Sequence, residues 1–236
     1  MLPVAILAGG LGTRLGAISA TVPKILVDVA GRPFAEHQLD WLEAQGVGHV
    51  VYCLGHLGEQ VVAALGDGSR WGMRFDFVMD GPVLLGTGGA LRRAMVGRAD
   101  RFFVLYGDSL LTCDLAAIEQ AYNASGRRCL MTVLANGDQW DASNVVFANG
   151  AIVTYDKQRR VPEMKHIDYG LGIVSTSRLL SYSADQPLDL ARVYQDELKA
   201  GELTGYEVHT RFYEIGSPQG LEETRAFVDA YARRSR

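Results

Sequence analysis

The sequence predicts an α/β fold of three layers, with helices on both faces of a mixed, mostly parallel central sheet. Short, continuous apolar runs such as Val4–Ala8 are typical of strands that are buried on both faces, and helix-length segments alternate with them. The 236 residues are 48% hydrophobic and 21% charged, which is the composition of a globular protein. Because no stretch has the composition of a linker and no internal repeat occurs, we expect one domain over residues 1–236.

The first half of the chain alternates strands and helices, which implies parallel pairing with right-handed crossovers. The first strand breaks into glycines, and the first helix has Pro33 in its first turn and Gly46 beyond its end. The expected strands are Val4–Ala8, His49–Leu54, Phe75–Val78, Phe102–Tyr106 and Cys129–Leu134. One expected helix opens at Gly31–Pro33. Three others are expected over Leu57–Leu65, Gly86–Met95 and Asp114–Ser125.

The second half predicts hairpins and therefore a mixed sheet. Asn149 and Gly150 form a turn signal between the expected strands Val145–Phe147 and Ile152–Tyr155. Further strands are expected at Leu171–Ser175, Leu203–Val208 and Phe212–Ile215, with helices at Asp189–Lys199 and from Ser217 to Tyr231. Residues 232–236 are expected to be a frayed, solvated end.

Charge and composition exclude several classes of protein. A net charge of −4 with 23 Lys and Arg argues against a general nucleic-acid or anionic-membrane surface, but leaves room for a local basic pocket. No apolar run approaches the ~18 residues of a membrane span, and the N-terminus does not resemble a secretory signal. Cys53, Cys113 and Cys129 are far apart, so we expect reduced, buried thiols in a cytoplasmic protein. The sequence is compatible with a homo-oligomer.

The strongest local signal is L-A-G-G-L-G-T-R-L, residues 7–15, directly after the first expected strand. Glycines free the backbone to expose its N–H groups, which can wrap a polyphosphate, and Arg14 offers a planar cation to phosphate oxygens. No Gly-Lys-Ser/Thr follows, so this is not a Walker loop. The candidate nucleotide-binding residues here are Leu7, Ala8, Gly9, Gly10, Gly12 and Thr13. The alternative is a tight turn with a surface arginine.

Lys24 follows Pro23 about ten residues after the glycine loop. The combination G-G-x-G-T-R-L and P-K resembles the signature of the sugar-1-phosphate nucleotidyltransferases, also called nucleotide-sugar pyrophosphorylases, and the resemblance extends from residue 4 to about residue 225. It implies a Rossmann-like, GT-A-like nucleotidyltransferase fold in which Arg14 and Lys24 are catalytic. It also implies a nucleotide-binding half over about residues 1–110 and a sugar-binding half over about residues 111–236.

The same resemblance assigns the segment L-G-T-G-G-A to the base and ribose of the nucleotide. The residues implied are Gly86, Thr87 and Gly88, with Leu84 and Leu85 as an apolar wall. This form of the segment looks more like that of enzymes that use guanine nucleotides, so GTP is favoured. The alternative is a helix N-terminus whose glycines serve packing.

The resemblance also implies Mg²⁺. Asp108 stands at the end of a buried strand, where α/β folds place ligand sites, and corresponds to the family's metal aspartate. Glu214, in E-I-G-S-P, stands where the family has a second metal aspartate. Glutamate can bind Mg²⁺ through the same oxygens, although its reach is one methylene longer. The alternatives are a loop-capping Asp108 and a surface Glu214.

In the second half, Asp156-Lys157 resembles the family's E-K motif, which makes Lys157 the candidate ligand of the sugar phosphate. Lys165 is a rival for this role. Asn144, Asp168 and Tyr169 are candidate partners of sugar hydroxyls, although Asp168 and Tyr169 are also compatible with a turn-forming aspartate and a packed tyrosine.

The reaction implied by the resemblance joins a sugar 1-phosphate to a nucleoside triphosphate and releases pyrophosphate, giving an NDP-sugar. The segments L-G-T-G-G-A and F-Y-E-I-G-S-P, with the compact length, look most like those of heptose-1-phosphate guanylyltransferases, which make GDP-heptose. One alternative is the same fold acting on a hexose 1-phosphate or another phosphorylated acceptor. The other is a non-catalytic protein that binds nucleotide sugars.

Overall fold

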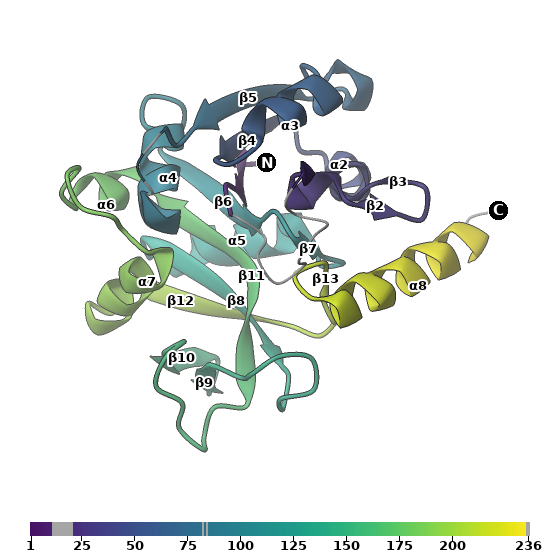
Figure 1. The fold of residues 1–236 in the computed structure, drawn as a ribbon. Coiled ribbons are helices and arrows are strands. Elements are labelled where there is room, and N and C mark those ends of the chain that lie inside the picture. Colours follow the sequence, from purple (N-terminus) through teal and green to yellow (C-terminus); the bar gives the residue numbers. More distant parts are fainter. Residues whose placement is uncertain (11–20, 82, 84, 235–236) are drawn as a thin grey trace.

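The computed structural model describes residues 1–10, 21–81, 83 and 85–234 of the chain (Figure 1). The strands are β1 (Val4–Ala8), β2 (Asp28–Val29), β3 (Arg32–Pro33), β4 (His49–Leu54), β5 (Arg74–Met79), β6 (Arg101–Tyr106), β7 (Ser109–Leu110), β8 (Cys129–Ala135), β9 (Val145–Ala148), β10 (Ala151–Tyr155), β11 (His166–Ser175), β12 (Leu203–Val208) and β13 (Tyr213–Glu214). The α-helices are α2 (Phe34–Ala44), α3 (Gly58–Leu65), α4 (Gly86–Met95), α5 (Leu115–Ser125), α6 (Thr176–Leu180), α7 (Leu190–Lys199) and α8 (Pro218–Arg234). Two short 3-10 helices are η2 (Lys24–Leu26) and η3 (Ser69–Trp71).

One mixed sheet of nine strands runs through the described residues, in the order β10-β9-β11-β6-β1-β4-β5, with β8 paired to β11 and β12 paired to β8. Strands β6, β1, β4 and β5 pair in parallel, as the alternation of strands and helices predicts. Strand β11 runs antiparallel between β6 and β8 and joins this parallel part to the rest. The expected mixed sheet is confirmed.

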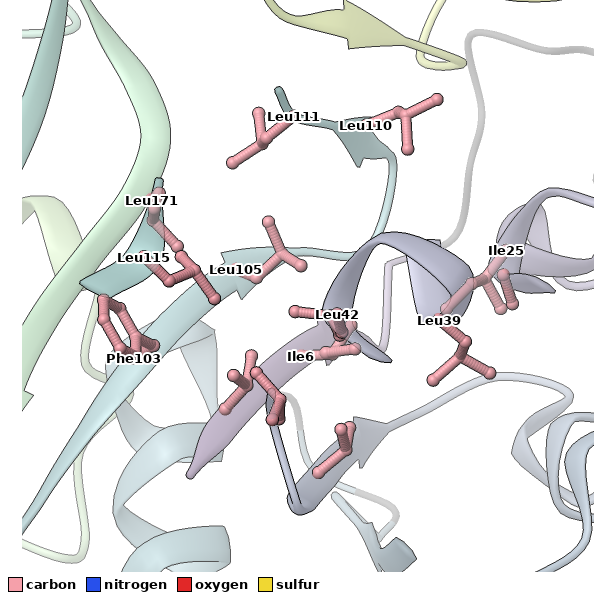
Figure 2. Close-up of a cluster of buried hydrophobic side chains, with 14 of the residues drawn as sticks. Ile6, Ile25, Leu39, Leu42, Phe103, Leu105, Leu110, Leu111, Leu115 and Leu171 are labelled. Carbon is pink, nitrogen blue, oxygen red and sulfur yellow. The ribbon is translucent and has the colours of Figure 1, made fainter. Parts of the chain in front are cut away.

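Two apolar cores, one on each face of the sheet, produce the expected three layers. Along β1, Val4 and Ile6 point to one face and Ala5 to the other. Helices α2, α3 and α5 bury side chains against the first face, and α4, α6 and α7 against the second. Figure 2 shows part of the first core, where Leu42 of α2 lies beside Ile6 and Leu115 of α5 lies near Phe103.

Helix starts follow the local rules of capping. Asp114 accepts hydrogen bonds from the N–H groups of Ala116 and Ala117 at the start of α5, and Asp189 accepts one from Ala191 at the start of α7. Strands β1, β4 and β12 and helix α4 have the bounds that the sequence predicts. The turn signal at Asn149 and Gly150 is confirmed, since both have positive φ between β9 and β10.

Several boundaries differ from the prediction. The helix expected to open at Pro33 begins at Phe34, because Arg32–Pro33 pairs with Asp28–Val29 as a small ribbon. Strand β11 begins at His166 and not at Leu171, and it shifts register between Asp168 and Gly172. The strand expected over Phe212–Ile215 is limited to Tyr213–Glu214. Residues 232–234, expected to fray, continue helix α8.

All three cysteines are buried free thiols, as expected from their spacing. Burial raises the pKa of Cys113 and of Cys129 to about 12, so both thiols stay protonated at neutral pH. In the part of the chain that the structure covers, no helix combines the length and the apolar character needed to cross a bilayer.

Candidate active site

The carboxyl ends of the parallel strands form one edge of the sheet, and a cavity of about 450 Å³ lies over that edge. Its wall follows the strand order, from Asp108 after β6, over Gly9 and Gly10 after β1 and Cys53 of β4, to Asp80 after β5. The other lining residues are Leu7, Ala8, Lys24, Ile25, Leu85, Gly86, Thr87, Ala90, Tyr106 and Gly107. The cavity has the size of a small-molecule site.

The described part of the glycine loop contributes Leu7, Ala8, Gly9 and Gly10 to this cavity. Gly107 lets the strand ends approach closely, since a Cβ there would lie only 2.7 Å from the Leu7 carbonyl oxygen. The other loop residues named by the sequence, Gly12, Thr13 and Arg14, lie outside the described residues, as does Leu84.

Lys24 and Asp108 form an ion pair inside the cavity. Lys24 begins the 3-10 helix η2, and its Nζ donates to Asp108 Oδ2 at 2.6 Å. The side chains are 17% and 29% exposed, so the pair is partly shielded from water while still open to a ligand. The sequence prediction that Lys24 reaches the glycine-loop edge is therefore consistent with its position.

Asp108 sits on a firmly held segment. The buried Gln38 of α2 donates from Nε2 to the carbonyl oxygens of Tyr106 at 3.2 Å and Ser109 at 2.7 Å. These two bonds tie the strand end to a helix that packs in the core, which reduces the freedom of the carboxylate.

The start of α4 is only partly available to a ligand. Gly86 and Thr87 line the cavity, but the N–H groups of Gly88 and Gly89 donate to the carbonyl oxygen of Leu188 at 2.8 and 3.1 Å. The N–H of Gly88 is thus used to pack α4 against the segment before α7, and the assignment of Gly88 to nucleotide binding stays a prediction. Thr87 Oγ1 likewise accepts from the N–H of Leu190 at 2.8 Å.

A second cavity, of about 430 Å³, shares Tyr106 and Asp108 with the first. Apart from Ser109, its remaining wall comes from the second half of the chain, including Asn144, Lys157, Asp168, Tyr169, Glu214, Trp140, Asp141, Gly170, Phe212 and Ser217. The structure thus brings together residues that the sequence assigned to the sugar phosphate and the metal.

Lys157 is the cation of this second cavity. Its Nζ lies 3.4 Å from Asp168 Oδ2 and donates to the Tyr106 hydroxyl at 3.2 Å. Burial alone would lower the pKa of Lys157, but the carboxylate of Asp168 and the hydroxyl of Tyr106 outweigh it and raise the pKa, so the ammonium stays charged. The rival Lys165 is exposed and does not line either of these cavities.

Asp168 is the buried anion opposite Lys157, with a side chain only 4% exposed. It accepts from the Tyr155 hydroxyl at 3.2 Å and from the N–H of Gly170 at 3.1 Å. The last bond spans the register shift of β11, so Asp168 stabilises a bulged strand and not the turn that was the alternative. Asn144 Oδ1 accepts from the N–H of Asp168 at 2.9 Å and supports the same corner.

Tyr169 borders the cavity but is a packed residue, 1% exposed. Its ring meets Phe212 edge-on at 5.9 Å between centroids, and its hydroxyl accepts from the N–H of Thr112 at 3.5 Å. The alternation along β11 turns this side chain away from Asp168 into the core. Tyr169 is thus packed, as in the alternative that the sequence left open, and its role as a sugar ligand at the cavity it borders stays a prediction.

The backbone of Glu214 lies next to that of Asp108, although the two residues are far apart in sequence. Strand β13 pairs antiparallel with β7, which places Glu214 opposite Ser109, and the N–H of Ile215 donates to the Asp108 carbonyl oxygen at 3.0 Å. This long-range pairing brings the two expected metal carboxylates to the wall of one cavity.

The carboxylate of Glu214, however, is bonded to the start of α8. Oε2 accepts from the N–H of Gly216, and Oε1 accepts from the Ser217 hydroxyl at 2.7 Å. A methyl group on Gly220 would overlap this carboxylate. The Ser217 hydroxyl in turn accepts from the N–H of Gly220 in α8 at 3.0 Å, so Glu214 supports the cap of this helix from its positive end.

Mg²⁺ commonly binds one or two carboxylates together with substrate phosphates and several waters. Asp108 and Glu214 supply that donor set at one cavity and fit the ion, provided that Asp108 shares its oxygen with Lys24 and Glu214 leaves the α8 start. Across the described ranges, no group of three or more His, Cys, Asp or Glu side chains could hold a metal by itself.

Two residues that line the site, Tyr106 and Asp80, are not among the site residues predicted from the sequence. Tyr106 contributes to both cavities and bonds Lys157, although only its neighbour Asp108 was singled out. Asp80 follows a buried strand as Asp108 does, and that shared position could have identified it.

Comparison with known proteins fits this geometry, since residues 4–165 match the MobA-like NTP transferase domain. The chain belongs to the MobA-like NTP transferase family. A UTP–glucose-1-phosphate uridylyltransferase of Synechocystis is 27% identical over 88% of this chain and 58% of its own length. A mannose-1-phosphate guanylyltransferase of Mycobacterium tuberculosis is 32% identical over 56% of this chain and 37% of its own length. This MobA-like chain thus spans only part of the length of these relatives.

Among solved structures, the MobA-like fold is matched by HddC from Yersinia pseudotuberculosis, complexed with GMP-PN. The TM-score is 0.77 at 24% identity, over 97% of this chain and all of that one. This likeness concerns the fold.

Proposed function

We propose that this protein joins a sugar 1-phosphate to a nucleoside triphosphate and releases pyrophosphate, giving an NDP-sugar. The observation that carries the proposal is a pair of cavities with a common wall, Tyr106 and Asp108, and with one lysine in each. The first cavity would take the triphosphate and the second the sugar 1-phosphate. We treat residues 1–236 as one domain, with a nucleotide-binding half over about 1–110 and a sugar-binding half over about 111–236.

The chemistry is an in-line displacement at the α-phosphorus. An oxygen of the sugar phosphate forms the new P–O bond, the bond between the α-phosphorus and the bridging oxygen breaks, and pyrophosphate leaves with that electron pair. The attacking oxygen is already anionic, so no strong general base is required. The two polyanions repel by about 4 kcal/mol for each charge pair at ~4 Å and an effective dielectric near 20.

The chain's own cations lower this repulsion. Lys24 lies beside Asp108, in the wall that the two cavities share, where it can bind triphosphate oxygens. Lys157 lies in the second cavity, where it can bind the sugar phosphate. We assign Arg14 to the triphosphate on the basis of the sequence resemblance. Asp108 and Glu214 would hold Mg²⁺, which when bound neutralises phosphate charge. Asp168 would accept hydrogen bonds from sugar hydroxyls, and the amide group of Asn144 would donate to them or accept from them.

For the finer assignment we propose GTP as the nucleotide and a heptose 1-phosphate as the sugar, with a hexose 1-phosphate as the alternative. The L-G-T-G-G-A segment and the guanylyltransferase relative support guanine, whereas the uridylyltransferase relative leaves UTP as the competitor. The protein is proposed to work in the cytoplasm, in agreement with its free thiols.

A pyrophosphate-release screen tests the proposal. Four nucleoside triphosphates are crossed with heptose and hexose 1-phosphates, with Asp108→Asn as the inactive control. We expect release with one sugar phosphate and a strong preference for GTP. Tight nucleotide binding without release in any combination would instead identify a non-catalytic nucleotide-sugar-binding protein.

A further inference from the structure

The wall of the second cavity continues along the sheet edge beyond Asp108, toward a tryptophan that the proposed chemistry does not use. Strand β11 is antiparallel to both β6 and β8, so β6 and β8 run in the same direction and end at the same edge. Asp108 follows β6, and Trp140 lies in the loop that follows β8. Both residues line the second cavity, and β11 lies between their two strands.

The phosphate of a bound sugar 1-phosphate belongs at the β6 end of this cavity. Lys157 is the one cation among the described residues that line it, and its Nζ donates to the hydroxyl of Tyr106, the last residue of β6, at 3.2 Å. The first cavity, on the other side of Tyr106, would take the triphosphate. The sugar ring therefore extends from Lys157 over the start of β11 toward Trp140.

The loop that carries Trp140 is held by the buried side chain of Asn136. The Oδ1 of Asn136 accepts from the N–H of Trp140 at 3.3 Å, and its Nδ2 donates to the carbonyl oxygen of Asp141 at 2.5 Å. The Arg211 guanidinium lies over the indole ring, 4.8 Å from its centroid, and forms an ion pair with Glu223. The ring is therefore oriented before a ligand binds.

These contacts do not bury the indole ring. Trp140 remains 38% exposed and borders the cavity. A pyranose ring is a suitable partner, because the C–H groups on its faces carry a slight positive charge and the face of an aromatic ring is negative. Covering the ring with these C–H groups also removes apolar surface from water. The hydroxyls around the edge of the sugar then stay free to bind polar groups of the wall.

We propose that Trp140 is a specificity residue for the sugar, whose ring stacks on the indole while its phosphate is bound by Lys157. This role rests on the proposed function, because it requires a sugar 1-phosphate in the second cavity. Stacking contributes to the binding of the sugar and not to that of its phosphate. The two contributions can therefore be measured separately.

The test compares the binding of heptose 1-phosphate, mannose 1-phosphate and inorganic phosphate to the full chain by calorimetry. Mg²⁺ and the α,β-methylene analogue of GTP or UTP are present, so that the nucleotide site is offered its ligand and no turnover occurs. We expect Trp140→Ala to bind the sugar phosphate about 10-fold more weakly, the loss of one aromatic stack, and to bind inorganic phosphate as the wild type does. Trp140→Phe keeps an aromatic face and should retain most of the affinity. Lys157→Ala should weaken the binding of both ligands.

Tryptophan emission gives a second readout of the contact. The sugar phosphate should change the emission of the wild type but not that of Trp140→Phe, since Trp41 and Trp71 line neither cavity. Val161→Ala is the matched control, because Val161 is an exposed apolar residue outside both cavities, and it should behave as the wild type in both measurements. Thermal unfolding of each variant shows whether it is folded.

Two outcomes would refute the role of Trp140 and leave the proposed function intact. One is an unchanged affinity of Trp140→Ala for the sugar phosphate, and the other is an equal loss of affinity for the sugar phosphate and for inorganic phosphate. Failure of every sugar phosphate to bind to the wild type would instead refute the proposed function, and this inference with it.

Discussion

Lys24 Nζ and Asp108 Oδ2 lie 2.6 Å apart, although the two residues are separated by 84 positions in the chain. The contact joins the segment after the glycine loop to the end of β6, at the wall that both cavities share. The carboxylate therefore already has one cation, and a bound triphosphate must share that cation with it. Exchange of partners at this pair is the electrostatic step that we expect ligand binding to require.

Lys24→Ala should weaken triphosphate binding by roughly 10- to 100-fold, the range of a lost charge-assisted hydrogen bond. The loss arises from the missing cation and from the Asp108 carboxylate that is left facing the phosphates. Calorimetric titration with the triphosphate alone measures it. An unchanged dissociation constant would remove Lys24 from the nucleotide site.

Lys157→Ala should mainly raise the KM for the sugar phosphate, because Lys157 lies in the second cavity. It should also lower the free energy of unfolding by about 1–3 kcal/mol, since Asp168 would be buried without its cation. Steady-state kinetics and denaturant unfolding give the two readouts. Lys165→Ala is the matched control and should change neither. A change confined to the nucleotide KM would contradict the division of the site.

Asp108→Asn keeps the shape of the side chain and removes its charge. We expect the fold to be retained, because Gln38 holds the backbone of this segment and not the carboxylate. Turnover should fall by about 10²–10³, as is typical when one electrostatic contact to the transition state is lost. Full turnover of this variant in Mg²⁺ would show that Asp108 does not hold the metal.

Glu214→Gln should lose activity as Asp108→Asn does, while Glu214→Asp should lose only part of it, with Mn²⁺ narrowing the deficit of the aspartate. The glutamine should also destabilise the protein by about 1 kcal/mol, because its amide group replaces one of the two acceptor oxygens that hold Gly216 and Ser217 just before α8. Kinetics at varied Mg²⁺, together with thermal unfolding, separate the two effects. If Glu214→Gln unfolds at a lower temperature than the wild type but has the same turnover, the role of Glu214 is restricted to holding the residues just before α8.

The pKa of Asp80 has a consequence for stability, since burial raises it and the charge of Arg93 opposes this only in part. Because the folded pKa of Asp80 is raised, its charged form disfavours the folded state above that pKa, and the penalty is lost as the pH falls below the unfolded value. Asp80→Asn should therefore unfold at the same or a higher temperature than the wild type at pH 7, with the difference shrinking in acid.

Much of the first half could be predicted from the sequence, because its signals are local. The apolar run of β1 and the glycine-led start of α4 each fix an element within a few residues. The sequence predicts β11 only from Leu171, whereas the strand begins at His166. The reason is that Asp168, Tyr169 and Gly170 interrupt the apolar pattern at the point where the strand bulges. A bulge is a feature of pairing and has no periodic signal of its own.

The site was harder to predict than the fold. The resemblance named Asp108, Glu214 and Lys157, but the direction of each side chain depends on contacts distant in sequence, such as that of Glu214 with the start of α8. Gly88 and Tyr169 were assigned to ligands, yet the structure uses them in packing against Leu188 and Phe212. Asp80 belongs to no motif, and its place in the wall of the first cavity becomes visible only in the structure.

The place of β11 in the sheet bears on how the protein is synthesised. Strand β6 pairs with β1 on one side and with β11 on the other, and β11 comprises residues 166–175. A nascent chain that has not yet reached this point carries β6, with its apolar Phe102 to Leu105, as an unprotected edge that invites association with other chains. This edge of β6 is covered only when β11 docks against it.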